Sequence, residues 1–171
     1  MEGKMMVRPL RCCILVICCL AFFGCTLKAV DTMETGDKAS VKSKVLIATQ
    51  KSRFKDEVVS EIKKALGDNV FYVKVLDVRL LPNESVDDYH AIVILNRCMA
   101  GRPDPRVESF IDTVQDQNKV IVLTTGRLDS WKPESSQVDA MTSASTMSET
   151  DKVARTIADK VMAIIKSQPH I

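Results

Sequence analysis

Side chains that act as nucleophiles or metal ligands are scarce in this sequence. Cys98 is the only cysteine after residue 25, and the two histidines are His90, which precedes an apolar run, and His170. No spacing of Cys, His and carboxylate residues matches a metal site. Neither glycine-rich nucleotide motif, G-x-x-x-x-G-K-[ST] or G-x-G-x-x-G, occurs. We therefore expect no metal and no phosphoryl transfer, and a hydrolase that uses Cys98 is a minor alternative.

Hydroxyl and basic side chains instead follow an apolar run early in the body of the chain. Thr49-Gln50-Lys51-Ser52-Arg53 comes directly after Val45-Leu46-Ile47-Ala48. Small hydroxylated residues at the start of a helix let backbone N–H groups approach an anion, and Lys51 and Arg53 add positive charge. The segment is a candidate anion site. In the alternative interpretation, Lys51 and Arg53 are solvated residues at a helix start.

The elements that must position these residues are short apolar runs alternating with helical patterns. The runs are 45–48, 70–76, 91–95 and 120–123, with a weaker one at 138–142. Continuously apolar runs are typical of parallel strands that helices cover on both faces. We expect helices after Ser52, after Asp104-Pro105 and after Ser148, the last opened by a capping box. The link from Asp77 to Ala91, interrupted by Pro82, predicts a turn or short helix.

Strand and helix in this rhythm resemble the flavodoxin-like fold, over about residues 44–167. Residues 88–95, followed by Ala100-Gly101-Arg102 and 105–111, are similar to the third strand, loop and helix of short flavodoxin domains. The resemblance implies an α/β, three-layer, doubly wound parallel sheet of five strands in the order 2-1-3-4-5, in a domain spanning 44–168. Ligands of such sheets lie at the carboxyl ends of the strands, here 49–54, 96–101, 124–131 and 142–146.

The resemblance also implies FMN as a cofactor, although its phosphate loop departs from the family pattern T-x-T-G-x-T. Thr49 and Ser52 keep hydroxyl groups, but glycine is absent and Phe54 replaces the last threonine. Lys51 and Arg53 would supply charge instead. The candidates for contact with the flavin ring come from the two later loops: Met99 and Gly101 in one, Gly126 and Trp131 in the other.

These ring contacts have alternatives. Trp131 is the only tryptophan, and it either stacks on the ring or folds over a surface groove. Met99 stands where an aromatic residue is expected and is otherwise a core residue.

A second flavin signal lies at Asp139-Ala140-Met141-Thr142-Ser143-Ala144-Ser145. It resembles the D-x-x-[ST]-[GS]-A-[ST] stretch of domains that carry covalent FMN in membrane-attached redox complexes. The resemblance implies that Ser145 is esterified to the flavin phosphate. In the alternative interpretation, the stretch is a strand that ends in a small-residue loop.

The pattern at the start of the chain indicates an export signal. Three basic residues precede an unbroken apolar run from Cys12 to Phe23, which is shorter than the roughly 20 residues that span a bilayer. Gly24-Cys25 resembles the lipobox of bacterial lipoproteins. This implies a signal peptide over 1–24, lipidation at Cys25, a flexible tether over 25–43, and a lipid-anchored protein of the bacterial cell envelope, outside the cytoplasm. A soluble secreted form and a retained anchor are alternatives.

Composition reduces the number of possible functions further. The formal net charge of +2 lies in the leader: the first 24 residues hold three basic residues and one acidic residue, which leaves 21 of each sign in the remainder. Balanced charge argues against a nucleic-acid partner. Two hypotheses remain: a membrane-anchored FMN-linked electron-transfer or redox accessory protein, and a cofactor-free flavodoxin-like module that binds a protein or small ligand at the same surface.

Overall fold

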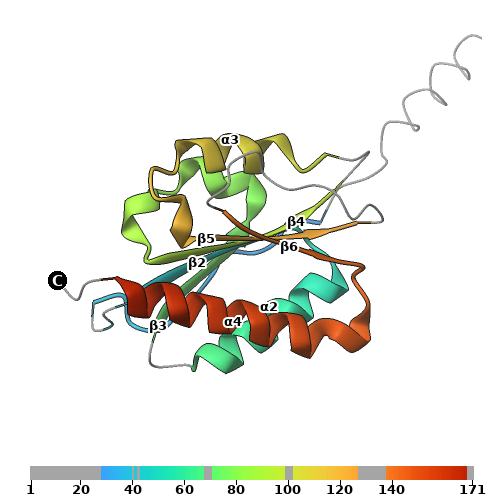
Figure 1. Cartoon of the computed structure of the whole chain (residues 1–171), viewed down its shortest axis with the longest axis horizontal. Helices are drawn as coiled ribbons and strands as arrows, with labels where there is room; N and C mark the ends of the chain where they lie inside the picture. Colours follow the sequence, from blue (N-terminus) through green and yellow to red (C-terminus); the bar gives the residue numbers. More distant parts are fainter. Residues whose placement is uncertain are drawn as a thin grey trace, which may run out of the picture.

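The computed structural model describes residues 28–39, 41, 43–67, 71–98, 102–126 and 138–168. Within these residues the strands form one twisted sheet in the order β1-β3-β2-β4-β5-β6 (Figure 1). Strands β2 to β6 are parallel to their neighbours, and β1 is antiparallel to β3. The strands are β1 (Met33–Thr35), β2 (Ser43–Thr49), β3 (Phe71–Asp77), β4 (Ala91–Arg97), β5 (Val120–Thr125) and β6 (Asp139–Ser143).

Three helices cover the two faces of the sheet. Helices α2 (Arg53–Leu66) and α4 (Thr150–Ser167) lie on one face, and α3 (Pro105–Thr113) lies on the other (Figure 1). Short 3-10 turns complete the chain at Val78–Asn83, Val86–Asp88, Gln117–Lys119 and Met147–Glu149. The first two turns confirm the short helical link expected between Asp77 and Ala91. Numbered among themselves, the five parallel strands run 2-1-3-4-5, which confirms the predicted fold class.

The strands are buried on both faces because alternate side chains enter two separate cores. Val45 and Ile47 of β2 pack under α2 and α4, whereas Leu46 and Ala48 pack under α3. All four side chains are fully buried. Burial of each large aliphatic side chain stabilises the fold by about 1.5–3 kcal/mol, and the continuous apolar runs supply this on both sides of the sheet.

The antiparallel strand β1 lies within 25–43 and corrects the expectation of a flexible tether at residues 33–35. Met33 pairs with Val75 and Thr35 with Val73, so this segment covers the free edge of β3. Gly36 turns the chain at φ 87°, where a Cβ atom would lie 2.5 Å from the Phe71 carbonyl oxygen. A strand of three residues is too short for an alternating pattern, which explains why the sequence did not reveal it.

Two of the three expected helix starts are as predicted. The Ser52 hydroxyl accepts a hydrogen bond from the Lys55 N–H at 3.2 Å, and the Asp104 carboxylate accepts one from the Arg106 N–H at 3.0 Å. The capping box at Ser148 is wrong. Ser148 lies inside a 3-10 turn, and α4 begins at Thr150, whose hydroxyl donates to the Met147 carbonyl.

Within the described residues, no helix is both long and apolar enough to cross a bilayer. Residues 1–27, with the expected signal peptide and Cys25, lie outside the described residues, so the lipid anchor stays a prediction.

Candidate functional site

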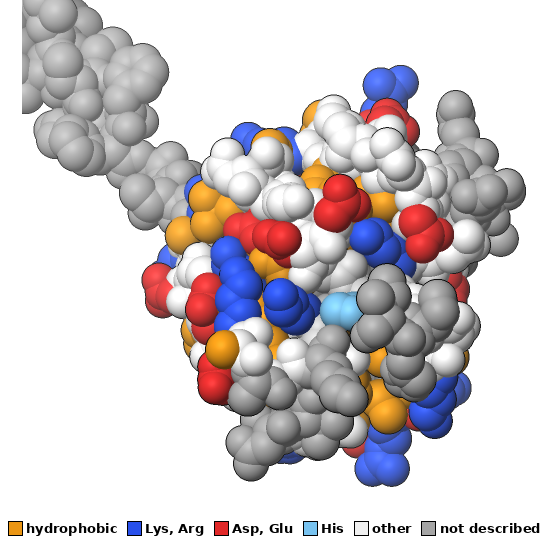
Figure 2. Space-filling view, turned by 90° about the vertical axis from the view of Figure 1, so that its left-hand side faces the viewer, with side chains coloured by type: hydrophobic (Ala, Val, Ile, Leu, Met, Phe, Trp, Pro, Cys, Tyr) orange, Lys and Arg blue, Asp and Glu red, His pale blue; other side chains and the backbone are white. Residues whose placement is uncertain are grey.

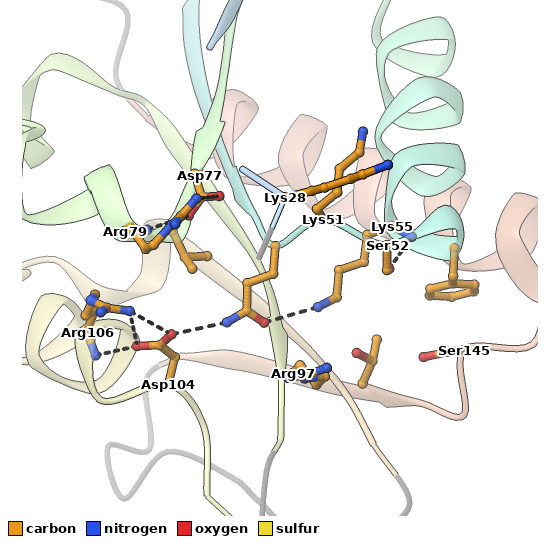
Figure 3. Close-up of a pocket in the computed structure, with 14 residues that line it drawn as sticks. Lys28, Lys51, Ser52, Lys55, Asp77, Arg79, Arg97, Asp104, Arg106 and Ser145 are labelled. Carbon is orange, nitrogen blue, oxygen red and sulfur yellow. Dashed lines mark hydrogen bonds and ion pairs between the residues drawn. The ribbon is translucent and has the colours of Figure 1, made fainter. Parts of the chain in front are cut away.

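All five parallel strands end at one crevice of about 270 Å³ (Figure 3). The β2–α2 loop forms one wall, and the start of α3 lies across from it. The segments that follow β3 and β6 close the ends. The crevice lies where strand order reverses between β2 and β4, the position at which doubly wound sheets bind ligands. Its lining is Lys28, Gln50, Lys51, Ser52, Phe54, Lys55, Asp77, Val78, Arg79, Arg97, Asp104, Arg106, Thr125 and Ser145.

Among the described residues, the lining is strongly cationic, with six Lys or Arg side chains against two carboxylates. Arg79 pairs with Asp77 at 2.8 Å, and Arg106 pairs with Asp104 at 3.3 Å. Lys51 pairs with Asp56 at 3.0 Å, outside the lining itself. With these pairs counted, cations still outnumber carboxylates among the described residues of the lining. An anionic ligand is therefore favoured electrostatically.

Lys55 occupies the centre of this site. Its side chain is 2% exposed, and its Nζ donates to the Gln50 Oε1 at 3.3 Å. Gln50 in turn donates from its Nε2 to the Asp104 carboxylate at 3.2 Å, which links α2 to α3 (Figure 3). Burial, together with the nearby Arg97 charge, lowers the pKa of Lys55 to about 8. A buried ammonium group whose partner is a neutral amide is costly, and an anion beside it would offset that cost.

Asp77 holds Arg79 at the rim of the crevice. Burial alone would raise the pKa of Asp77, but hydrogen bonds from the Arg79 side chain, the Arg79 N–H and the Val30 N–H lower it below its usual value. The carboxylate therefore stays ionised at neutral pH. It ties the N-terminal segment to the end of β3.

Three of the residues expected from sequence line the crevice, namely Lys51, Ser52 and Ser145. The backbone of Ser145 has a φ of 61°, and its N–H donates to the Ser143 hydroxyl at 3.2 Å. Two others lie elsewhere: Thr49 is buried beside a smaller cavity under β1, and Arg53 is exposed outside the crevice lining.

Gly126 is explained by contact between two loops. A Cβ atom at this position would lie 3.1 Å from the Cys98 Cβ, and the Cys98 N–H donates to the Thr125 carbonyl at 2.9 Å. The close approach is therefore to the neighbouring strand end. Contact of Gly126 with a flavin stays a prediction. Met99, Gly101 and Trp131 lie outside the described residues, so the ring side of the expected site also stays a prediction.

Sequence reasoning missed most of the cations that line the crevice. Lys55 carried a usable signal, because its spacing to Val59, Ile62 and Leu66 places it on the buried face of α2. Lys28 carried no such signal, since it lies in a segment that the sequence predicts to be a tether. Arg79 and Arg106 follow Asp77 and Asp104 by two residues, a spacing that sequence alone does not separate from surface ion pairs.

Solved structures with a similar fold include one described as an oxidoreductase and two described as flavodoxins. An oxidoreductase from Corynebacterium diphtheriae matches with a TM-score of 0.51 and 11% identity, over 74% of this chain and 99% of that chain. The fold is flavodoxin-like. A flavodoxin from the domain Archaea matches with a TM-score of 0.46 and 14% identity, over 70% of this chain and 99% of that chain. A flavodoxin, WrbA-like protein from Agrobacterium tumefaciens has a TM-score of 0.46 and 11% identity, over 74% and 99%.

At such identities the likeness concerns the fold alone. No known family profile matches the sequence, and no curated protein matches it. Function must therefore be argued from the crevice itself.

The donor set of the crevice fits the phosphate end of FMN. Lys55 and Arg97 offer charged donors, and the hydroxyl of Ser145 lies on the same crevice. The flavodoxin pattern relies on a glycine-containing loop at this place. Here the Ser52 hydroxyl already accepts the Lys55 N–H, so charged side chains would supply most of the attraction for a phosphate.

The buried charge of Lys55 gives the stability of the protein a specific pH dependence. Below pH 8 the folded and unfolded states are both protonated at Lys55, and the folded state bears the full cost of burial. Between about pH 8 and the usual Lys value of 10.5, the unfolded state binds more protons, so this cost disappears as pH rises. We expect Lys55→Met to raise the free energy of unfolding at pH 7 by on the order of 2 kcal/mol. The gain should shrink steadily toward pH 10.

Urea denaturation between pH 7 and 10, without ligand, measures this difference. Lys152→Met is the matched control, because Lys152 is exposed on α4, and its effect should be small and independent of pH. A Lys55→Met variant that is less stable than the wild type at pH 7 contradicts the assignment of Lys55 as a costly buried charge.

Proposed function

We propose that this protein is a flavodoxin-like redox protein that binds FMN in the cationic crevice, held at the membrane outside the cytoplasm by a lipid on Cys25. The observation that carries the proposal is Lys55, a cation that is 2% exposed, lies in the ligand crevice of this fold, and has a neutral amide as its hydrogen-bond partner. FMN is the phosphate-bearing ligand that the resemblance of the sequence to flavodoxins implies. When bound, it would supply one- and two-electron chemistry.

The residues of the crevice have separate tasks in this proposal. Lys55, which is buried, and Arg97, which is exposed on the crevice lining, bind the phosphate, and Gln50 orients the Lys55 ammonium group through its own bond to Asp104. Arg79 and Arg106 each pair with a carboxylate, which reduces their attraction for the phosphate. The Ser145 Oγ is the candidate atom for covalent attachment. Its position on the crevice lining agrees with the motif at 139–145.

A cofactor-free binding module is the second candidate, and one observation favours it. Two residues of the β2–α2 loop already have partners in α2: Ser52 caps the helix, and Lys51 pairs with Asp56 at 3.0 Å. Without glycine, this loop offers a phosphate fewer free N–H groups than the flavodoxin pattern does. In this case the same cations would bind an acidic group of another ligand.

Comparison of FMN with riboflavin, which lacks the phosphate, separates the two candidates. We expect the wild type to quench the fluorescence of FMN and to bind it more tightly than riboflavin. Lys55→Met should weaken FMN binding about 10- to 100-fold, because a hydrogen bond to a charged group contributes about 1.5–3 kcal/mol. Binding of riboflavin should be unchanged. Lys152→Met serves again as the control.

Other outcomes of this titration are informative. Equal affinities for FMN and riboflavin would mean that the crevice does not bind the phosphate group, which contradicts the proposal. If the protein is colourless when purified from its own membranes and binds neither compound, the result supports the cofactor-free module. Flavin that survives denaturation in the wild type but not in Ser145→Ala establishes covalent attachment, with Ser148→Ala in the neighbouring turn as control.

The anchor has its own test. Labelled fatty acid should enter the wild type during growth and should be absent from Cys25→Ser, because the thiol is the proposed site of lipidation. The intact mass of the mature protein should then correspond to an acylated chain that begins at Cys25. Equal labelling of the two proteins would contradict lipidation at this residue.

A further inference from the structure

The N-terminal segment of the described chain runs along the crevice. Lys28 lines the crevice, and the Val30 N–H donates to the Asp77 carboxylate at 3.0 Å. Residues Met33–Thr35 then pair with β3, which fixes the direction of this segment on the domain. The chain therefore reaches the body of the protein at the carboxyl ends of the strands.

The part of the chain that meets the membrane lies immediately before this point. The apolar run Cys12–Phe23 and Cys25 both precede Lys28, and Cys25 does so by only three residues. Three extended residues span at most about 10 Å. This holds whether acylated Cys25 or the retained apolar run enters the bilayer, so the crevice rim lies close to the membrane surface in both cases. The inference rests on the anchoring part of the proposed function.

In two of the ion pairs at this end of the molecule, the cation lies outward and the carboxylate inward. In the pair of Arg79 and Asp77, the arginine side chain is 42% exposed and the carboxylate 7%. In the pair of Arg106 and Asp104, the values are 52% and 15%. Lys28, Lys51, Arg53 and Arg102 are also exposed around the same rim. In the third pair, Lys51 and Asp56, the two side chains are similarly exposed, at 46% and 39%. At the two arginine pairs, a surface that approaches from outside therefore meets the basic group before the acidic one.

Apolar side chains accompany these cations. Leu80, next to Arg79, is 39% exposed, and Met147, in the turn before α4, is 41% exposed. Basic side chains mixed with exposed apolar ones are typical of surfaces that bind the interfacial region of anionic membranes. The opposite end, at the amino ends of the strands, has acidic and basic side chains interspersed (Figure 2).

We propose that the carboxyl-end face of the sheet docks on the surface of an anionic phospholipid bilayer, with the crevice opening toward it. The exposed rim cations bind headgroup phosphates, and Leu80 and Met147 enter the interface. Lys55 lies deeper and remains available to the crevice ligand. Docking of this kind would present that ligand to partners within the membrane.

Lysine footprinting of the anchored protein tests this orientation without any substitution. The full mature protein is reconstituted into vesicles of phosphatidylcholine alone or of phosphatidylcholine with phosphatidylglycerol, acetylated briefly, and analysed by mass spectrometry. We expect acetylation of Lys51, relative to exposed Lys166 near the other end, to fall several-fold only in the phosphatidylglycerol vesicles. High salt should restore it. Lys28 lies so near the anchor that its labelling reports anchoring alone.

A pair of variants supplies the matched control. Arg53→Gln with Arg102→Gln removes two rim charges outside the crevice lining. At about fivefold for each charge, the ratio of docked to undocked protein should fall about 25-fold. Lys63→Gln with Lys64→Gln removes two charges at the far end of α2 and should leave the Lys51 protection unchanged.

The outcomes separate docking from the proposals on which it depends. Flotation of the protein with vesicles tests the anchor, and FMN titration tests the crevice. If the protein floats but the ratio of Lys51 to Lys166 labelling is the same in both kinds of vesicle, docking is overturned while the anchor stands. Protection that appears in native membranes but not in phosphatidylglycerol vesicles also overturns it, and assigns the face to a membrane protein.

Discussion

A buried ammonium group at the meeting point of five strands is the constraint on which the site depends. Parallel strands direct their carboxyl ends to one edge of the sheet, so the segments that follow them must share a small volume. Lys55 lies in that volume with 2% of its surface exposed, and Gln50 and Arg97 lie beside it. Water cannot solvate the Lys55 charge fully, and the positive charge of Arg97 repels it. The crevice is thus prepared for an anion before any ligand arrives.

This arrangement differs in physical principle from a glycine-rich phosphate loop. Such a loop binds through several backbone N–H groups and the helix N-terminus, which requires small residues and little side-chain charge. Here Ser52 satisfies the Lys55 N–H, and the positive charge of the crevice comes from side chains contributed by several strand ends. Side-chain cations tolerate a wider range of ligand shapes than a fitted loop does. The crevice should therefore discriminate by charge more than by geometry.

Much of the fold was predictable because its causes are local. The continuous apolar run at 45–48 indicated a strand buried on both faces, and Ser52 and Asp104 indicated the helix starts that the structure contains. Features that depend on distant partners were not predictable. Strand β1 exists because β3 offers an open edge, and Ser148 fails as a cap because a 3-10 turn precedes α4.

The residues of the candidate site divide in the same way, into those with local causes and those that depend on distant contacts. Lys51, Ser52 and Ser145 were found from sequence because each follows a strand, and all three line the crevice. Lys55 was hidden because a lysine on a helix is ordinarily solvated, and only its spacing with apolar residues of α2 marks it as buried. Lys28 becomes part of the site only through the Val30 bond to Asp77, a contact across 47 positions of sequence.

Proton uptake during ligand binding tests the central claim most directly. At pH 8 Lys55 is partly deprotonated, whereas the phosphate of FMN is already a dianion. An anion placed beside Lys55 raises its pKa, so binding must take up part of a proton. Titration calorimetry with FMN in two buffers of different ionisation enthalpy measures this quantity. The account predicts a fractional uptake in the wild type that is lost in Lys55→Met; binding of FMN with identical heats in both buffers would contradict it.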